Sequence, residues 1–117
     1  MNENVTKLNQ QKYAPCVIEL ASEHSPAISF LSENKAFIEK LVSEAGAVLV
    51  RGGNIDNPAM VQQVSDIFFA DTLKNNTEHK PVAEGSSVQR PVDYSATEFL
   101  LWHNENTFNH TFPSKAI

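Results

Sequence analysis

The residues best suited to chemistry are His103 and Glu105, which stand one residue apart in the apolar segment LLWHNENTF, residues 100–108. If residues 99–105 form a strand, alternate side chains share one face, so the imidazole and the carboxylate point the same way. A buried carboxylate is costly to desolvate, and a metal ion is one of the few partners that removes this cost. The pair therefore matches two ligands of a 2-His-1-carboxylate iron site. The alternative is a solvent-facing or hydrogen-bonded pair at the end of a strand.

A third ligand close in sequence is harder to find. His110 lies in the polar segment NTFNHTFP, which is typical of an exposed loop, so we do not expect it to bind a metal. His24 and His79 also lie in polar segments and are expected to be solvated. The only cysteine, Cys16, has no neighbouring histidine, and RGGN lacks the spacing and the lysine of a phosphate-binding loop. Nucleophilic and nucleotide chemistry therefore find little support.

Apolar periodicity predicts the first elements that position this pair. The segment LSENKAFIEKLVSEAG, residues 31–46, is predicted to be a helix that Ser32 caps and Gly46 ends. The run AVLVRGG, residues 47–53, is predicted to be a buried strand that leads into a tight turn. We expect Arg51, at the end of that strand, to be a structural ion-pair partner rather than a substrate contact.

The rest of the chain is less regular. A second helix is expected to begin with Asn57 as its cap and Pro58 in its first position. It should end where a long polar loop, residues 71–96, begins, and a loop of this length is usually functional or disordered. Residues 16–20 are predicted to form an edge strand, and residues 1–14 a loosely packed arm. The inward faces of the two helices are expected to comprise Phe37, Ile38, Leu41, Val42 and Ala45, and Val61, Val64, Ile67 and Phe68.

The composition limits the class of protein. The chain has 117 residues, 41% hydrophobic and 20% charged, which is typical of one small globular domain. Its net charge of −5, without a Lys/Arg cluster, disfavours nucleic acid and anionic membranes as partners. No apolar run approaches the ~20 residues of a membrane span. A single cysteine and a polar N-terminus without signal-peptide features favour a cytoplasmic location.

The order of these motifs resembles a known family. The chain is similar to the N-terminal part of taurine dioxygenase-like, or clavaminate synthase-like, Fe(II)/2-oxoglutarate-dependent oxygenases. The similarity lies in the order of GAVLVRGG, a helix, a loop with QRPVDYSATEF, then LLWHNENTF and FPSKAI. The similarity runs from about Gly46 to Ile117. It is strongest to the amino-acid-hydroxylating branch, often associated with peptide natural-product pathways. In that branch the carboxylate is Glu, and H-N-E is followed by an aromatic residue and then a proline.

The resemblance implies an α+β fold: a partial double-stranded β-helix, or jelly roll, with flanking helices, in which residues 1–117 are one domain and residues 71–96 a loop near the active site. It implies that His103 and Glu105 are the catalytic iron ligands and that the co-substrate 2-oxoglutarate is decarboxylated to succinate. Related halogenases replace the carboxylate with a small residue, so Glu105 favours an oxygenase that hydroxylates its substrate.

Four further residues are implied to meet an amino-acid-like substrate. Arg90 resembles a loop arginine that pairs with a substrate carboxylate, and the alternative is an exposed loop charge. Ser95, Thr97 and Glu98 resemble a segment that borders the substrate. The alternative for these three is a turn before the strand whose hydroxyls cap the backbone.

The family also needs a second, distal histidine and an arginine that binds 2-oxoglutarate, and both are expected beyond Ile117. We therefore expect the remaining strands to come from a missing C-terminal portion or from a second chain. The alternative hypothesis from another class is a catalytically inert, truncated binding or assembly module that needs a second chain.

Overall fold

The computed structural model describes residues 5–20, 27–73, 79–103, 110–111 and 113–117. The chain divides into two compact units, Met1–Phe68 and Phe69–Ile117, which we treat separately. The prediction that residues 1–117 form one oxygenase domain stays a prediction. Over the residues listed above, no helix is both long and apolar enough to cross a membrane.

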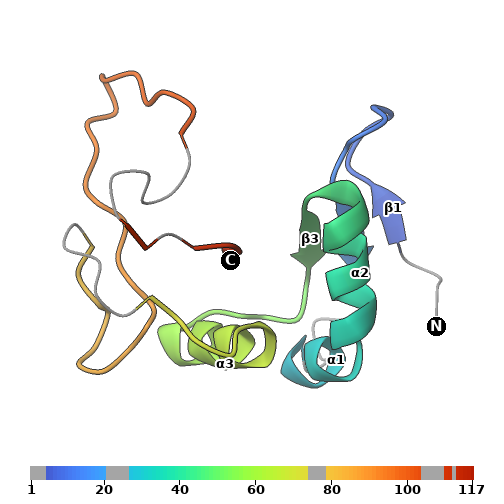
Figure 1. Cartoon of the computed structure of the whole chain (residues 1–117), viewed down its shortest axis with the longest axis horizontal. Helices are drawn as coiled ribbons and strands as arrows, with labels where there is room; N and C mark the ends of the chain where they lie inside the picture. The colour runs from blue at the N-terminus through green and yellow to red at the C-terminus, as the bar shows by residue number, and fades with distance from the viewer. Residues whose placement is uncertain (1–4, 21–26, 74–78, 104–109, 112) are drawn as a thin grey trace. The chain divides into compact units, whose positions relative to one another are not determined.

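A three-stranded mixed sheet forms the centre of the first unit (Figure 1). Strand β2 (Cys16–Glu19) lies between β1 (Val5–Lys7), which is antiparallel to it, and β3 (Val48–Arg51), which is parallel. Ile18 pairs with Val5 on one side and with Val50 on the other. The prediction that residues 16–20 form an edge strand was therefore wrong, because β1, which lies in the predicted arm 1–14, pairs with them. Strands pair through backbone hydrogen bonds, so a strand can form without an apolar sequence pattern.

Helices α1 (Ala27–Glu33) and α2 (Lys35–Ala45) follow β2. The predicted helix is confirmed as α2, but its predicted start with Ser32 as the cap was wrong, because Ser32 lies within α1 and the break between the helices falls at Asn34. The Asn34 N–H and side-chain amide both donate to the carbonyl of Phe30, at 3.0 and 2.9 Å. The C-terminal prediction is confirmed: Gly46 has φ +80° and its N–H donates to the Val42 carbonyl at 2.8 Å.

The core of the first unit lies where α2 packs on β2 and β3. Ile18, Leu31 and Ile38 form its buried centre. Partly buried side chains surround them: Val5, Leu20, Phe30, Leu41, Val42, Val48, Val50, Val64, Ile67 and Phe68. The predicted inward faces of the helices are thus confirmed at Ile38, Leu41, Val42, Val64, Ile67 and Phe68. Strand β3 is half-buried rather than buried, because Val48 and Val50 face the core while Leu49 alternates to the outside.

The end of β3 behaves as the sequence predicts. Gly52 and Gly53 both have φ +82° and turn the chain out of the sheet. Arg51 forms an ion pair with Glu19, with 3.2 Å between Nη1 and Oε1, which confirms its structural role. Both side chains are about half exposed, so the pair contributes little stability.

Helix α3 (Pro58–Phe68) begins as predicted. The side-chain oxygen of Asn57 accepts the N–H of Met60 at 3.0 Å, which satisfies one of the orphan donors at the helix start. Replacing Asn57 with alanine is expected to lower the free energy of unfolding of the first unit by about 1 kcal/mol. Urea unfolding followed by circular dichroism measures this. Asn57→Ser retains an acceptor and should cost only a few tenths of that; an equal loss in both variants would contradict the cap.

The described parts of the second unit contain neither helix nor strand, and their one regular pairing is an isolated antiparallel bridge between Pro81 and Gln89. The strand predicted over residues 99–105 is not present in its described portion, 99–103. A strand exists only when a neighbouring strand takes its backbone hydrogen bonds, and no described segment does so here. The described elements by themselves do not form a jelly roll, which stays a prediction.

Candidate functional site

His103 is described and exposed, and Glu105 lies outside the described residues. The Nδ1 atom of His103 lies 2.7 Å from the carbonyl oxygen of Leu101. Because a carbonyl oxygen can only accept, this hydrogen bond needs a proton on Nδ1, which leaves Nε2 as the ring atom that could bind a metal. Histidines that bind metals commonly donate their second ring nitrogen to a backbone carbonyl, which fixes the tautomer. His103 therefore fits a metal ligand, and the shared face with Glu105 stays a prediction.

The four residues from Ser95 to Glu98 form a turn. The Glu98 N–H donates to the Ser95 carbonyl at 3.0 Å, which closes it. The hydroxyls of Ser95 and Thr97 lie 2.7 Å apart, and the Thr97 N–H points to the Ser95 hydroxyl oxygen at 3.3 Å. The Tyr94 hydroxyl donates across the turn to the Phe99 carbonyl at 3.4 Å. These bonds match the turn-capping alternative, and a contact of these residues with substrate stays a prediction.

Arg90 stands at the end of a short hairpin that the sequence reasoning missed. Its N–H donates to the Lys80 carbonyl at 2.8 Å, and its carbonyl lies 3.0 Å from Nδ1 of His79. The loop turns at Gly85, with φ +77°, and the Val82 N–H donates to the Val88 carbonyl at 3.0 Å. The sequence feature that indicates this hairpin is the run of small and polar residues AEGSS between two valines. The hairpin fixes the backbone of Arg90 and leaves the residue exposed. Exposure agrees both with a substrate contact and with a loop charge that binds nothing.

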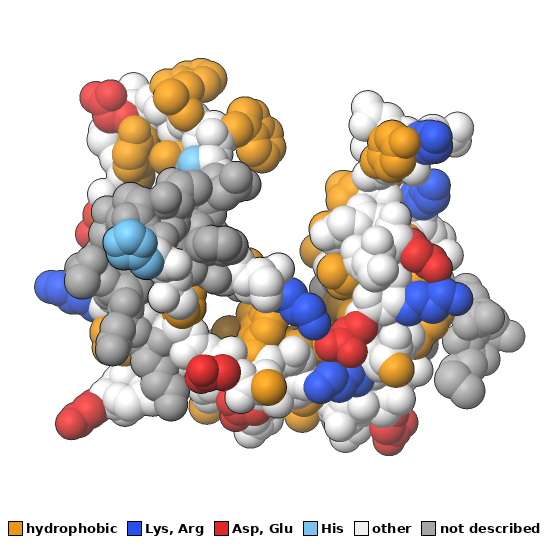
Figure 2. Space-filling view, viewed as in Figure 1, with side chains coloured by type: hydrophobic (Ala, Val, Ile, Leu, Met, Phe, Trp, Pro, Cys, Tyr) orange, Lys and Arg blue, Asp and Glu red, His pale blue; other side chains and the backbone are white. Residues whose placement is uncertain are grey.

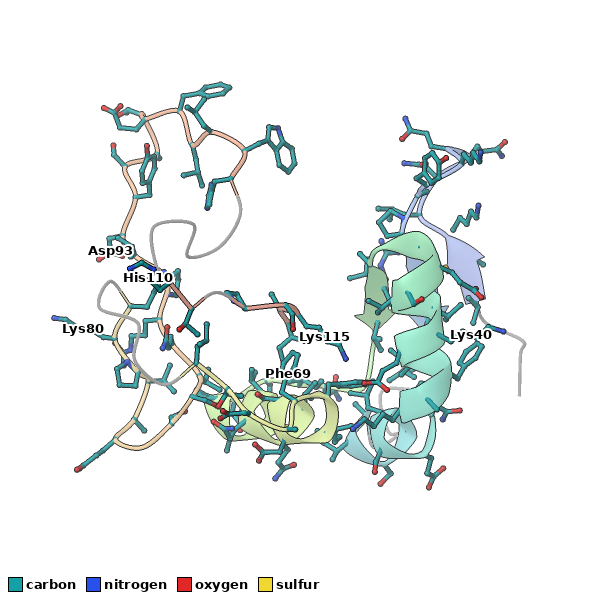
Figure 3. The ribbon with its side chains drawn as sticks, viewed as in Figure 1. Lys40, Phe69, Lys80, Asp93, His110 and Lys115 are labelled. Carbon is teal, nitrogen blue, oxygen red and sulfur yellow. The ribbon has the colours of Figure 1, made fainter. Side chains whose placement is uncertain are left out.

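Lys80 lies opposite Arg90 in the hairpin, and its side chain points outward from the second unit (Figure 3). His110, the histidine considered above as a third metal ligand, is exposed, as its polar surroundings predict. Within the described ranges, no three His, Cys, Asp or Glu side chains come close enough together to hold a metal ion. Glu105 lies outside these ranges, so the metal-binding pair stays a prediction.

The chain is similar to a protein named for the synthesis of dapdiamide. It is 30% identical over 83 residues to the dapdiamide synthesis protein DdaC of Enterobacter agglomerans, which covers 68% of this chain and 25% of that protein. The chain thus spans about a quarter of the length of the curated relative it matches. Since the match is longer than either Met1–Phe68 or Phe69–Ile117, it draws on both compact units. No family model and no solved structure matches the chain.

Proposed function

We propose that this chain is part of a non-heme Fe(II)/2-oxoglutarate-dependent oxygenase that hydroxylates an amino acid or a similar small molecule with a carboxylate. The observation that carries the proposal is the 30% identity with a dapdiamide synthesis protein over 83 residues. A role in the synthesis of a small molecule agrees with the resemblance to the amino-acid-hydroxylating branch. The ordered motif from Arg90 to Glu105 supplies the chemistry that such a role needs.

In this proposal His103 and Glu105 hold Fe(II), and a histidine outside this chain completes the ligand set. The iron and 2-oxoglutarate, when bound, supply the oxidation: substrate C–H, O2 and 2-oxoglutarate become substrate C–OH, succinate and CO2. The hydrogen bond from His103 Nδ1 to Leu101 keeps Nε2 as the ligating nitrogen. Arg90 would bind the substrate carboxylate as a charge-assisted pair, and the turn Ser95–Glu98 would border the bound substrate.

The direct test measures turnover by the complete polypeptide that the natural reading frame encodes. The protein is supplied with Fe(II), 2-oxoglutarate and O2 and offered each of the common amino acids in turn. We expect at least one of them to stimulate succinate formation and to gain one oxygen atom, with one succinate for each hydroxylated product by mass spectrometry. Succinate no higher than in the sample without iron, for every amino acid, would contradict the proposal.

The second candidate function is a catalytically inert binding or assembly module that needs a second chain. It is favoured by the exposed apolar side chains that precede His103, which are typical of a surface covered by another polypeptide. The same assay separates the candidates, because the inert module forms no succinate even when its partner is present.

A further inference from the structure

The backbone of Arg90 is bonded on both sides at the open end of the hairpin. Its N–H donates to the Lys80 carbonyl at 2.8 Å, and Nδ1 of His79 lies 3.0 Å from its carbonyl oxygen. Two residues that form a hydrogen-bonded antiparallel pair normally exchange both of their main-chain bonds. Among the described residues, Lys80 forms only the first of these bonds with Arg90, and the imidazole of His79 takes the place of the second. Because a carbonyl oxygen can only accept, His79 is the donor.

The rest of the hairpin has hydrogen bonds of its own. The Val82 N–H donates to the Val88 carbonyl at 3.0 Å, and the Val88 N–H donates to the Ser86 hydroxyl oxygen at 3.0 Å. Both bonds lie nearer the turn than Arg90 does, and neither involves it. Loss of the His79 ring should therefore free the carbonyl of Arg90 and leave the turn of the hairpin intact.

The side chain of Arg90 is open to a ligand. The residue is exposed, and within the described ranges its guanidinium forms no ion pair, whereas that of Arg51 is paired with Glu19. On the face seen in Figure 2, the coloured Lys and Arg side chains of the second unit (blue) stand singly rather than in a basic patch. A single guanidinium on a fixed backbone suits one carboxylate, which it can bind through two parallel N–H···O bonds, better than it suits a polyanion.

We propose that His79 is a positioning residue for Arg90: its imidazole holds the Arg90 carbonyl and so keeps the guanidinium where a substrate carboxylate meets it. The inference rests on the proposed function, in which Arg90 binds this carboxylate. Without the ring, the backbone of Arg90 has to be ordered when the substrate binds, and that cost weakens binding. His79 is thus expected to act on substrate binding and not on the chemical step.

The kinetic test uses the complete polypeptide and, as its probe, the common amino acid that gives the most succinate in the turnover assay above. His79→Ala is expected to raise KM for this amino acid about fivefold to tenfold, as loss of one hydrogen bond does. The kcat value and KM for 2-oxoglutarate should stay within about twofold. His79→Asn places an amide N–H donor close to the position of Nδ1 and should restore most of the KM.

A double-mutant cycle shows whether His79 acts through Arg90. Arg90→Ala alone should raise KM for the amino acid at least about tenfold, because it removes a charge-assisted pair. In the Arg90→Ala protein, His79→Ala should then change KM by less than about twofold. Ser86→Ala is the matched control, because it removes a hydrogen bond of the same hairpin that does not involve Arg90, and KM should again stay within about twofold.

Amide hydrogen exchange of the 117-residue chain tests the positioning without substrate, iron or turnover. His79→Ala should speed exchange of the Arg90 N–H by at least about threefold, since the pair with Lys80 loses its second bond, and should leave exchange of the Val82 N–H unchanged.

The outcomes separate this inference from the proposed function. Unchanged exchange of the Arg90 N–H, an unchanged KM in His79→Ala, or an equal effect of His79→Ala with and without Arg90 would refute the positioning role alone. An equal rise of KM in Ser86→Ala would also refute it, because His79 would then act on the hairpin as a whole. If the unaltered protein forms no succinate with any amino acid, the proposed function fails, and the role of His79 in substrate binding fails with it.

Discussion

Replacing His103 and Glu105 together with alanine is expected to lower the affinity for Fe(II) by at least about a hundredfold. Loss of even a hydrogen bond that supports a metal ligand costs about 10–100-fold, and this variant removes two ligands outright. Succinate formation should fall with the affinity. The affinity is measured by anaerobic titration calorimetry of the complete polypeptide with Fe(II), or with Mn²⁺ as a redox-inert substitute.

His79 offers a matched control for this experiment. Its Nδ1 lies 3.0 Å from the carbonyl of Arg90, as that of His103 lies 2.7 Å from the carbonyl of Leu101, but no carboxylate follows it two residues later. His79→Ala should therefore leave the Fe(II) affinity within about twofold. Equal affinity in the double variant and the unaltered protein would refute the iron site. A loss in His110→Ala as large as that in the double variant would restore His110 as the third ligand.

Gly53→Ala is expected to lower the free energy of unfolding of the first unit by about 3 kcal/mol, which is enough to unfold much of a marginally stable unit. A Cβ atom at this position would lie 2.5 Å from Cβ of Ala27 and 2.8 Å from Cδ1 of Leu20. The first neighbour lies on helix α1 and has no flexible end to move. The left-handed φ of +82° accounts for about 1 kcal/mol of this loss, because it is unfavourable for any residue with a Cβ atom.

Gly46→Ala separates the two contributions. Gly46 has φ +80° and belongs to the same unit, but a Cβ atom there would meet nothing within 4 Å. Gly46→Ala should therefore lower the free energy of unfolding only by the cost of the left-handed conformation, about 1 kcal/mol. Urea unfolding of both variants, followed by helical circular dichroism, measures the difference. Equal losses would mean that the turn after β3 does not pack closely against α1.

Several elements could be predicted from the sequence because their signals are local. Asn57 before a proline specifies the start of α3, since the cap bonds a backbone group three residues away. Gly46 specifies the end of α2 in the same way, because only glycine takes the left-handed conformation at low cost. The spacing of Ile38, Leu41 and Val42 shows which face of α2 is buried, since a helix places such residues on one side.

The errors arose where the partner is distant in sequence. Whether β2 is an edge strand or a central one depends on β1, which is short and carries no apolar pattern in its sequence. The break at Asn34 is an exception with a local partner: the Asn34 side-chain amide bonds the Phe30 carbonyl where the two helices meet, and the continuous apolar period gives no sign of it. Residues 99–102 have the composition of a buried strand, but they are not one in the structure, because no described segment takes their backbone hydrogen bonds.

The candidate site divides in the same way. The sequence by itself predicts the chemistry: histidine and glutamate are residue types that bind iron, and the spacing of His103 and Glu105 permits a shared face. Only the tertiary structure decided that Nδ1 of His103 lies against the Leu101 carbonyl, that a turn engages Ser95 and Thr97, and that a hairpin fixes the backbone of Arg90. The physical reason is that residue types specify which bonds a group can make, whereas the folded chain decides which partner comes within reach.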